Sequence, residues 1–92
     1  MPIAYLTLEL RIEGAHSLKD KRQVVRSIKD RLRNQFNVSV AEVDALDHRQ
    51  MIVLGFAAVG PEADLMRATL DQIVNALRCH PVAEFVDHEM EI

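Results

Sequence analysis

Apolar and polar residues alternate at the start of this chain. Between Ala4 and Ile12 every second side chain is apolar, and the intervening ones are tyrosine, threonine, glutamate and arginine. A period of two residues is typical of a strand with one buried face. This pattern predicts a strand from Ala4 to Ile12, which ends before Gly14.

The period changes to that of a helix after Gly14. Ser17, followed three positions later by Asp20, forms a short-armed capping box, in which each side chain can bond a free backbone amide of the first turn. Apolar residues then recur at helical spacing, at Leu18, Val24, Val25, Ile28 and Leu32. We therefore expect a helix that is capped by Ser17 and runs to about Asn34.

The second half of the chain predicts two more strands, a helix and a last strand. Residues 36–46 contain three valines and precede the turn residues Asp47 and His48, while residues 51–59 are almost continuously apolar. Gly60 and Pro61 then mark a helix start, with the proline expected at the first helical position. Ile73 and its apolar neighbours form the buried stripe of that helix. It is expected to end at residues 80–81, before a strand over residues 82–92.

This order of elements predicts a single α+β domain over residues 1–92. A β-α-β-β-α-β order is that of the ferredoxin-like fold, a four-stranded antiparallel sheet with two helices on one face. In strand order 4-1-3-2 the two apolar strands lie in the centre. The acidic last strand then forms an edge, where charge discourages pairing with other chains.

The sequence also bears on the compartment in which the protein resides. The first residues lack a signal-peptide pattern, and no apolar run approaches the roughly 18 residues that span a bilayer. A single cysteine, Cys79, has no partner for an internal disulfide and fits a reducing compartment. We expect a cytoplasmic protein without a membrane partner.

Charge is distributed unevenly. The net charge is −3, yet residues 1–33 hold eight lysines and arginines against four acids, and the remainder holds three against ten. At 100° per residue, five cations of the first helix fall within an arc of about 80°. These residues, the basic arc, are Lys19, Arg22, Arg26, Lys29 and Arg33. Four successive like-charge neighbours cost the helix about 1–2 kcal/mol in total, before Asp30 offsets part of this cost against Arg26 and Arg33.

The start of this helix is a candidate anion site. Lys21 falls within the apolar arc, so its stem is expected to pack on the sheet while its ammonium points toward the loop from Gly14 to Ser17. Lys19, Arg22, the Ser17 hydroxyl and free amides would then converge there, and a phosphate is the expected occupant. A solvated stripe and an acidic protein surface are the alternative explanations of the basic arc.

Other constellations give weaker signals. Tyr5 and Phe56 invite comparison with stacking aromatics of RNA-binding sheets, but nothing in the pattern places them on one face. Glu42 and Asp44 are expected on one face of a strand as solvated acids. The four histidines are scattered, and adjacent Cys79 and His80 lack zinc-site spacing. We expect no catalytic residues, no metal and no cofactor.

Two segments resemble a known family. The run from Gly14 to Arg22, with its Ser-Leu-Lys-x-Lys-Arg string, and residues 36–44, with Val-Ser-x-Ala-Glu-Val, are similar to the YlxP family of small bacterial proteins of unknown function. The resemblance covers nearly the whole chain and implies a ferredoxin-like fold. It also implies a gene often found near translation and ribosome-maturation factors, which favours RNA or the ribosome as partner.

Three functional hypotheses follow. The first is a non-enzymatic module that binds structured RNA or the ribosome through Ser17, Lys21 and the basic arc. The second is a structural or protein-interaction module that forms a homo-oligomer through the sheet face or strand edges. The third is a phosphate enzyme with His16 as base, although the loop before Ser17 lacks the glycine-rich pattern of acylphosphatases.

Overall fold

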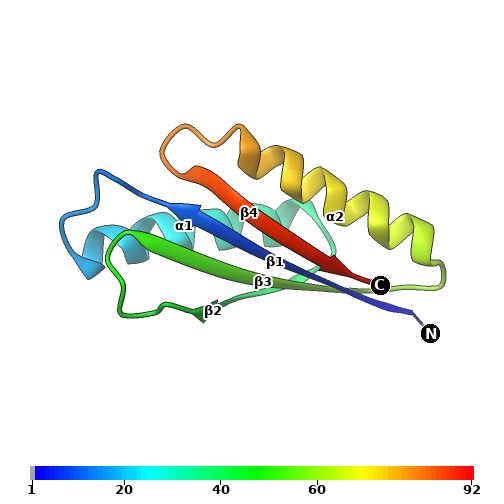
Figure 1. Ribbon diagram of the computed structural model, residues 1–92. Helices are drawn as coiled ribbons and strands as arrows, with labels where there is room; N and C mark the ends of the chain where they lie inside the picture. Colours follow the sequence, from blue (N-terminus) through cyan, green and yellow to red (C-terminus); the bar gives the residue numbers. More distant parts are fainter. Residues whose placement is uncertain (1) are drawn as a thin grey trace.

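The alternating and helical patterns form six elements in the computed structural model, which describes residues 2–92 (Figure 1). In chain order they are β1 (Ile3–Arg11), α1 (Leu18–Gln35), β2 (Ser39–Asp44), β3 (Met51–Val59), α2 (Ala63–Arg78) and β4 (Glu84–Glu91). The predicted order of strands and helices is confirmed.

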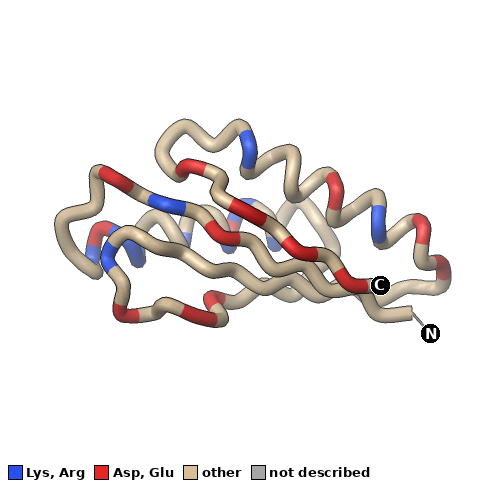
Figure 2. Tube along the Cα trace, viewed as in Figure 1, with Lys and Arg blue, Asp and Glu red and all other residues tan. Residues whose placement is uncertain are grey.

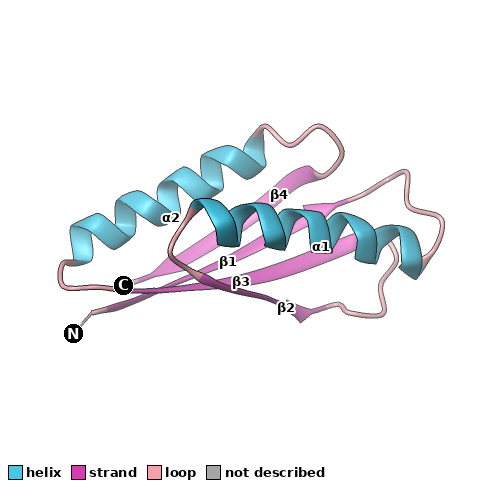
Figure 3. Cartoon of the chain, turned by 180° about the vertical axis from the view of Figure 1, so that it is seen from behind, coloured by secondary structure: helices cyan, strands magenta, loops and turns pink. Residues whose placement is uncertain are grey.

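The four strands form one antiparallel sheet in the order β2-β3-β1-β4. Both helices lie on the same face of this sheet, and the other face is uncovered (Figures 1 and 3). The fold is therefore the predicted ferredoxin-like α+β arrangement. No helix within residues 2–92 combines the length and apolarity needed to cross a bilayer.

The core lies between the sheet and the helices. The even-numbered residues of β1 and β3 point into it, because successive side chains of a strand alternate between faces. In β1 these are Ala4, Leu6, Leu8 and Leu10, and in β3 they are Ile52, Leu54, Phe56 and Ala58. Helix α1 adds Val25, Ile28 and Leu32, and α2 adds Met66, Leu70, Ile73, Val74 and Leu77.

The open face carries the odd-numbered residues. Tyr5 pairs with Ala57 on this face, whereas Phe56 pairs with Leu6 and is buried under the helices. The two aromatic residues therefore lie on opposite faces of the sheet and form no shared stacking platform. The side chains of β3 on the open face are all uncharged, and those of β4 include Asp87, Glu89 and Glu91.

Several predicted boundaries are wrong. The last strand begins at Glu84 and not at residue 82. Strand β2 begins at Ser39 and not at Phe36, because Phe36 is the C-cap of α1 and its amide still bonds to Leu32. Pro61 is not the first residue of α2, which has Glu62 as its N-cap and begins at Ala63. The proline instead lies in the connection that precedes the cap.

Candidate nucleic-acid interface

The basic arc lies along one flank of α1. Lys19, Arg22, Arg26 and Arg33 are exposed and Lys29 is half-buried. Within residues 2–92 the ion pair between Lys21 and Glu42 is the sole one closer than 4.0 Å, so no carboxylate neutralises the arc at that distance. Figure 2 shows the cations on α1 and a row of acids along β4. The structure thus separates positive and negative surfaces.

The opposite flank of α1 faces α2. Arg31, on that flank, lies close enough to His80 at the end of α2 to help lower its pKa. The buried side of α1, which includes Val25 and Ile28, faces the sheet. Since Arg31 and the basic arc lie on opposite sides of this buried face, the arc points away from α2 and toward the β2 side of the molecule. Figure 3 shows α2 and β2 on opposite sides of α1.

Ser17 caps α1 as predicted. Its hydroxyl accepts a hydrogen bond from the Asp20 amide at 3.2 Å, and the Asp20 carboxylate accepts one from the His16 amide, also at 3.2 Å. Both acceptors satisfy backbone donors that a helix start otherwise leaves free. The helix start therefore already holds one negative charge, which opposes a bound phosphate at this point.

The ammonium of Lys21 does not reach the loop from Gly14 to Ser17, and this prediction is wrong. The Lys21 side chain is fully buried, and its Nζ donates to the carbonyl of Ala45 at 2.6 Å and to that of Leu46 at 3.4 Å. It also lies 2.8 Å from Oε2 of Glu42. The long side chain thus crosses from α1 to the β2–β3 connection, where it is removed from solvent and from any phosphate on the arc.

The alternation predicted that Glu42 and Asp44 lie on the same face of the strand, and this prediction is wrong. Glu42 pairs with Leu54, on the helix side, but Asp44 pairs with Val53, on the open side. The register shifts between them because Val43 is an extra residue, a β-bulge, and a bulge reverses the alternation beyond it. Glu42 is consequently the partner of Lys21, with a side chain only 14% exposed, and not a solvated acid.

His80 closes the connection between α2 and β4. Its Nδ1 accepts hydrogen bonds from the amides of Val82 and Ala83, at 3.2 and 3.0 Å. Burial lowers the pKa of His80, and the positive charge of Arg31 lowers it further. Both effects favour the neutral imidazole that these two hydrogen bonds need, so His80 has a structural role in this connection. The adjacent Cys79 is exposed.

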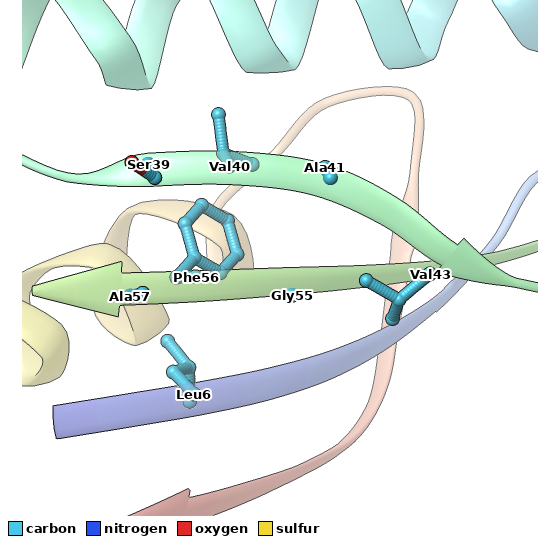
Figure 4. A pocket seen from close by; sticks show the side chains of 8 residues that line it. All are labelled: Leu6, Ser39, Val40, Ala41, Val43, Gly55, Phe56 and Ala57. Carbon is cyan, nitrogen blue, oxygen red and sulfur yellow. The ribbon is translucent and has the colours of Figure 1, made fainter.

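A shallow groove of about 260 Å³ follows β2 and β3 (Figure 4). Its lining residues are Leu6, Ser39, Val40, Ala41, Val43, Gly55, Phe56 and Ala57. Ser39 contributes the one polar side chain among these lining residues, and the others are apolar or glycine. Within residues 2–92 no three histidine, cysteine or acidic side chains are placed to hold a metal ion.

Three comparisons place this chain among known proteins. The structure of a REP-associated tyrosine transposase bound to a REP hairpin is similar over 97% of this chain, with a TM-score of 0.45 and 11% identity. The present chain spans about half, 54%, of that protein. Uncharacterized protein YlxP of Bacillus subtilis (strain 168) is 33% identical over 82 residues, which are 89% of each chain. The family described as protein of unknown function (DUF503) matches residues 3–90. Because the family model matches residues 3–90 and the Bacillus relative is 33% identical over most of both chains, this chain belongs to the DUF503 family, and the YlxP resemblance seen in its sequence is confirmed.

Proposed function

We propose that this domain binds RNA through the basic arc of α1, as a ribosome-associated or other RNA-binding module that performs no chemistry. The observation that carries the proposal is the absence, within residues 2–92, of a carboxylate within 4.0 Å of any cation of the arc. Five such cations on one helix flank repel one another. A polyanion laid along the flank would relieve this repulsion and release its own counterions.

The proposal no longer includes every residue expected from the sequence. Lys21 is enclosed and paired with Glu42, and the Ser17 hydroxyl is already bonded to the Asp20 amide. Lys19 and Arg22, at the exposed start of α1, and the three further cations of the arc remain available. RNA phosphates are therefore proposed to follow the flank of the helix and not to sit at its capped end.

Salt dependence of RNA binding tests the proposal. Five phosphate contacts to single-stranded RNA give a log–log slope of about −3.5. Binding of a labelled RNA of about 20 nucleotides, single-stranded or folded as a hairpin, is measured by fluorescence anisotropy. The KCl concentration is varied between about 50 and 300 mM, a range that includes the physiological ionic strength. Arg22→Gln/Arg26→Gln should reduce the magnitude of the slope by about 1.4 for the single strand.

The matched control is Arg11→Gln/Arg67→Gln, which removes the same charge from exposed positions outside the arc. This variant should bind with nearly the slope of the natural chain. Equal losses in both double variants, or a slope near zero for the natural chain, would show that the arc is merely solvated.

A homodimer through the open sheet face is the second candidate. It is favoured by the uncharged open-face side chains of β3, with exposed Val59 at one end and exposed Tyr5 beside them on β1. Light scattering at increasing protein concentration measures the molar mass. A mass that stays at that of one chain, 10.4 kDa, argues against this candidate.

A further inference from the structure

The two edges of the sheet differ in how they are protected. The β4 edge carries acidic side chains, which discourage pairing with another strand; they are Glu84, Asp87, Glu89 and Glu91. The β2 edge has no lysine and no proline between Ser39 and Glu42, and the charge of Glu42 is paired with Lys21. Strand β2 bonds to β3 on one side only. Its other side is therefore open to pairing from Ser39 to Glu42, before the bulge at Val43.

The basic arc lies on the flank of α1 that is nearer this open edge. The arc lies on the flank of α1 that is turned away from α2, and α1 itself packs beside β2 (Figure 3). A strand added outside β2 would lie about 4.8 Å beyond it, and its side chains would alternate between the two faces of the sheet. Those on the helix side would lie on the side of the sheet that carries the basic arc, while those on the other side would lie next to Ser39 and Ala41.

Charge selects among possible occupants of the edge. A second copy paired symmetrically through β2 would bring a second basic arc beside the first, and like charges at an interface oppose association. A strand with carboxylates at every second position would instead be attracted on its helix side. Small or apolar residues at the alternate positions suit the side of Ser39 and Ala41.

We propose that the β2 edge, from Ser39 to Glu42, binds an extended acidic segment of another protein as a fifth strand, whose alternate carboxylates face the basic arc. Main-chain hydrogen bonds supply the pairing, as in other cases of strand addition, and the arc selects the acidic pattern. The bulge at Val43 ends the available edge. This inference uses the position of the arc but does not depend on RNA binding.

A synthetic peptide tests the proposal on the full chain. The probe has seven residues, glutamate alternating with alanine, and blocked ends; its isomer has four glutamates followed by three alanines. When the alternating peptide is titrated into isotope-labelled protein, the NMR signals of the amides from Ser39 to Glu42 should shift. The isomer should bind at least about fivefold more weakly. Since alternate amides of a strand point to opposite edges, N-methylation of either the glutamates or the alanines should abolish binding, and N-methylation of the other set should not.

Protein variants and RNA complete the experiment. Arg22→Gln/Arg26→Gln should weaken binding of the alternating peptide by about two- to thirtyfold, since two exposed ion pairs of about 0.2–1 kcal/mol each are lost. Arg11→Gln/Arg67→Gln should leave it unchanged. Equal binding of both isomers, no effect of N-methylation, or shifts confined to α1 would overturn the proposal in favour of electrostatic adsorption. Peptide binding at β2 without salt-dependent RNA binding would refute the proposed function alone, and the reverse result would refute this inference alone.

Discussion

The ammonium of Lys21 lies 2.8 Å from a carboxylate oxygen of Glu42, in the interior between α1 and β2. That oxygen, Oε2, accepts no aligned hydrogen bond, so its attraction to Nζ is that of an ion pair. Two carbonyls of the β2–β3 connection complete the surroundings of the ammonium. One of them belongs to Ala45, which has a positive φ of 55°. Lys21 therefore joins the first helix to the hairpin.

Removing one partner of this pair should destabilise the fold. Lys21→Ala leaves Glu42 charged and mostly buried, which costs about 3–5 kcal/mol. Lys21→Met/Glu42→Met removes both charges and keeps apolar volume, so it should recover most of that loss. Urea unfolding measures the free energy of unfolding for each variant. Lys19→Ala, at an exposed position, should change it by less than about 0.5 kcal/mol. A double variant as unstable as Lys21→Ala would show that the two charges are not coupled.

The basic arc should reduce the stability of the protein. Arg26 has Arg22 four positions before it and Lys29 three positions after it. Arg26→Gln removes both repulsions and also the attraction to Asp30, four positions after it, so it should raise the free energy of unfolding by about 0.2–0.5 kcal/mol at low salt. The gain should shrink in 1 M NaCl, where charges are screened within about 3 Å. Arg67→Gln in α2 is the control. A decrease in stability on replacing Arg26 would mean that its side chain makes favourable contacts within the fold.

The Ser17 cap should contribute measurably to folding. Ser17→Ala removes the acceptor of the Asp20 amide and should cost about 1 kcal/mol. Ser27→Ala, at an exposed position inside the same helix, should be neutral or slightly stabilising because alanine favours helix interiors. Thermal unfolding followed by circular dichroism compares the two variants. Similar effects at both positions would contradict a capping role for Ser17.

Gly55 provides room for the β-bulge. A Cβ at position 55 would lie 2.8 Å from Cγ1 of Val43, closer than side chains pack. Gly55→Ala should therefore destabilise the protein by about 1 kcal/mol or more, as overpacking does. Gly55→Ala/Val43→Ala should recover the stability that Gly55→Ala loses. Gly14→Ala, whose Cβ would meet nothing within 4 Å, is the control. If Gly55→Ala is as stable as the natural chain, Val43 moves aside without cost.

Protonation of His80 should favour the unfolded chain. The pKa of His80 is lowered in the fold from its ordinary value of 6.5, by burial and by Arg31. The unfolded chain therefore binds this proton at higher pH than the folded one, and the free energy of unfolding falls as the pH drops from about 6.5 through the lowered pKa. His80→Asn keeps an acceptor but does not titrate, so it should lose this part of the pH dependence. His16→Gln should retain it, and identical pH profiles for His80→Asn and the natural chain would refute this account.

The elements were predictable because each depends on nearby residues. The alternation around Leu6 and Leu8, the helical spacing of Val25 and Ile28, and the Ser17 cap are local patterns, and all three are confirmed. Their order was sufficient to predict the sheet order, since few ways of connecting six elements bury both apolar faces. The basic arc was also visible, because helical geometry alone places its cations on one flank.

The sequence by itself thus determined the elements, the ferredoxin-like fold and the positive flank of α1. The tertiary structure decided the partner of Lys21, because a long flexible side chain can turn to either of two loops, and Glu42 lies 21 positions away in the sequence. It also decided which face Asp44 occupies, because a one-residue bulge changes the register without altering the hydrophobic pattern. Finally, the basic arc comes to lie on the β2 side of the molecule only when α1 docks on the sheet, and long-range packing sets that arrangement.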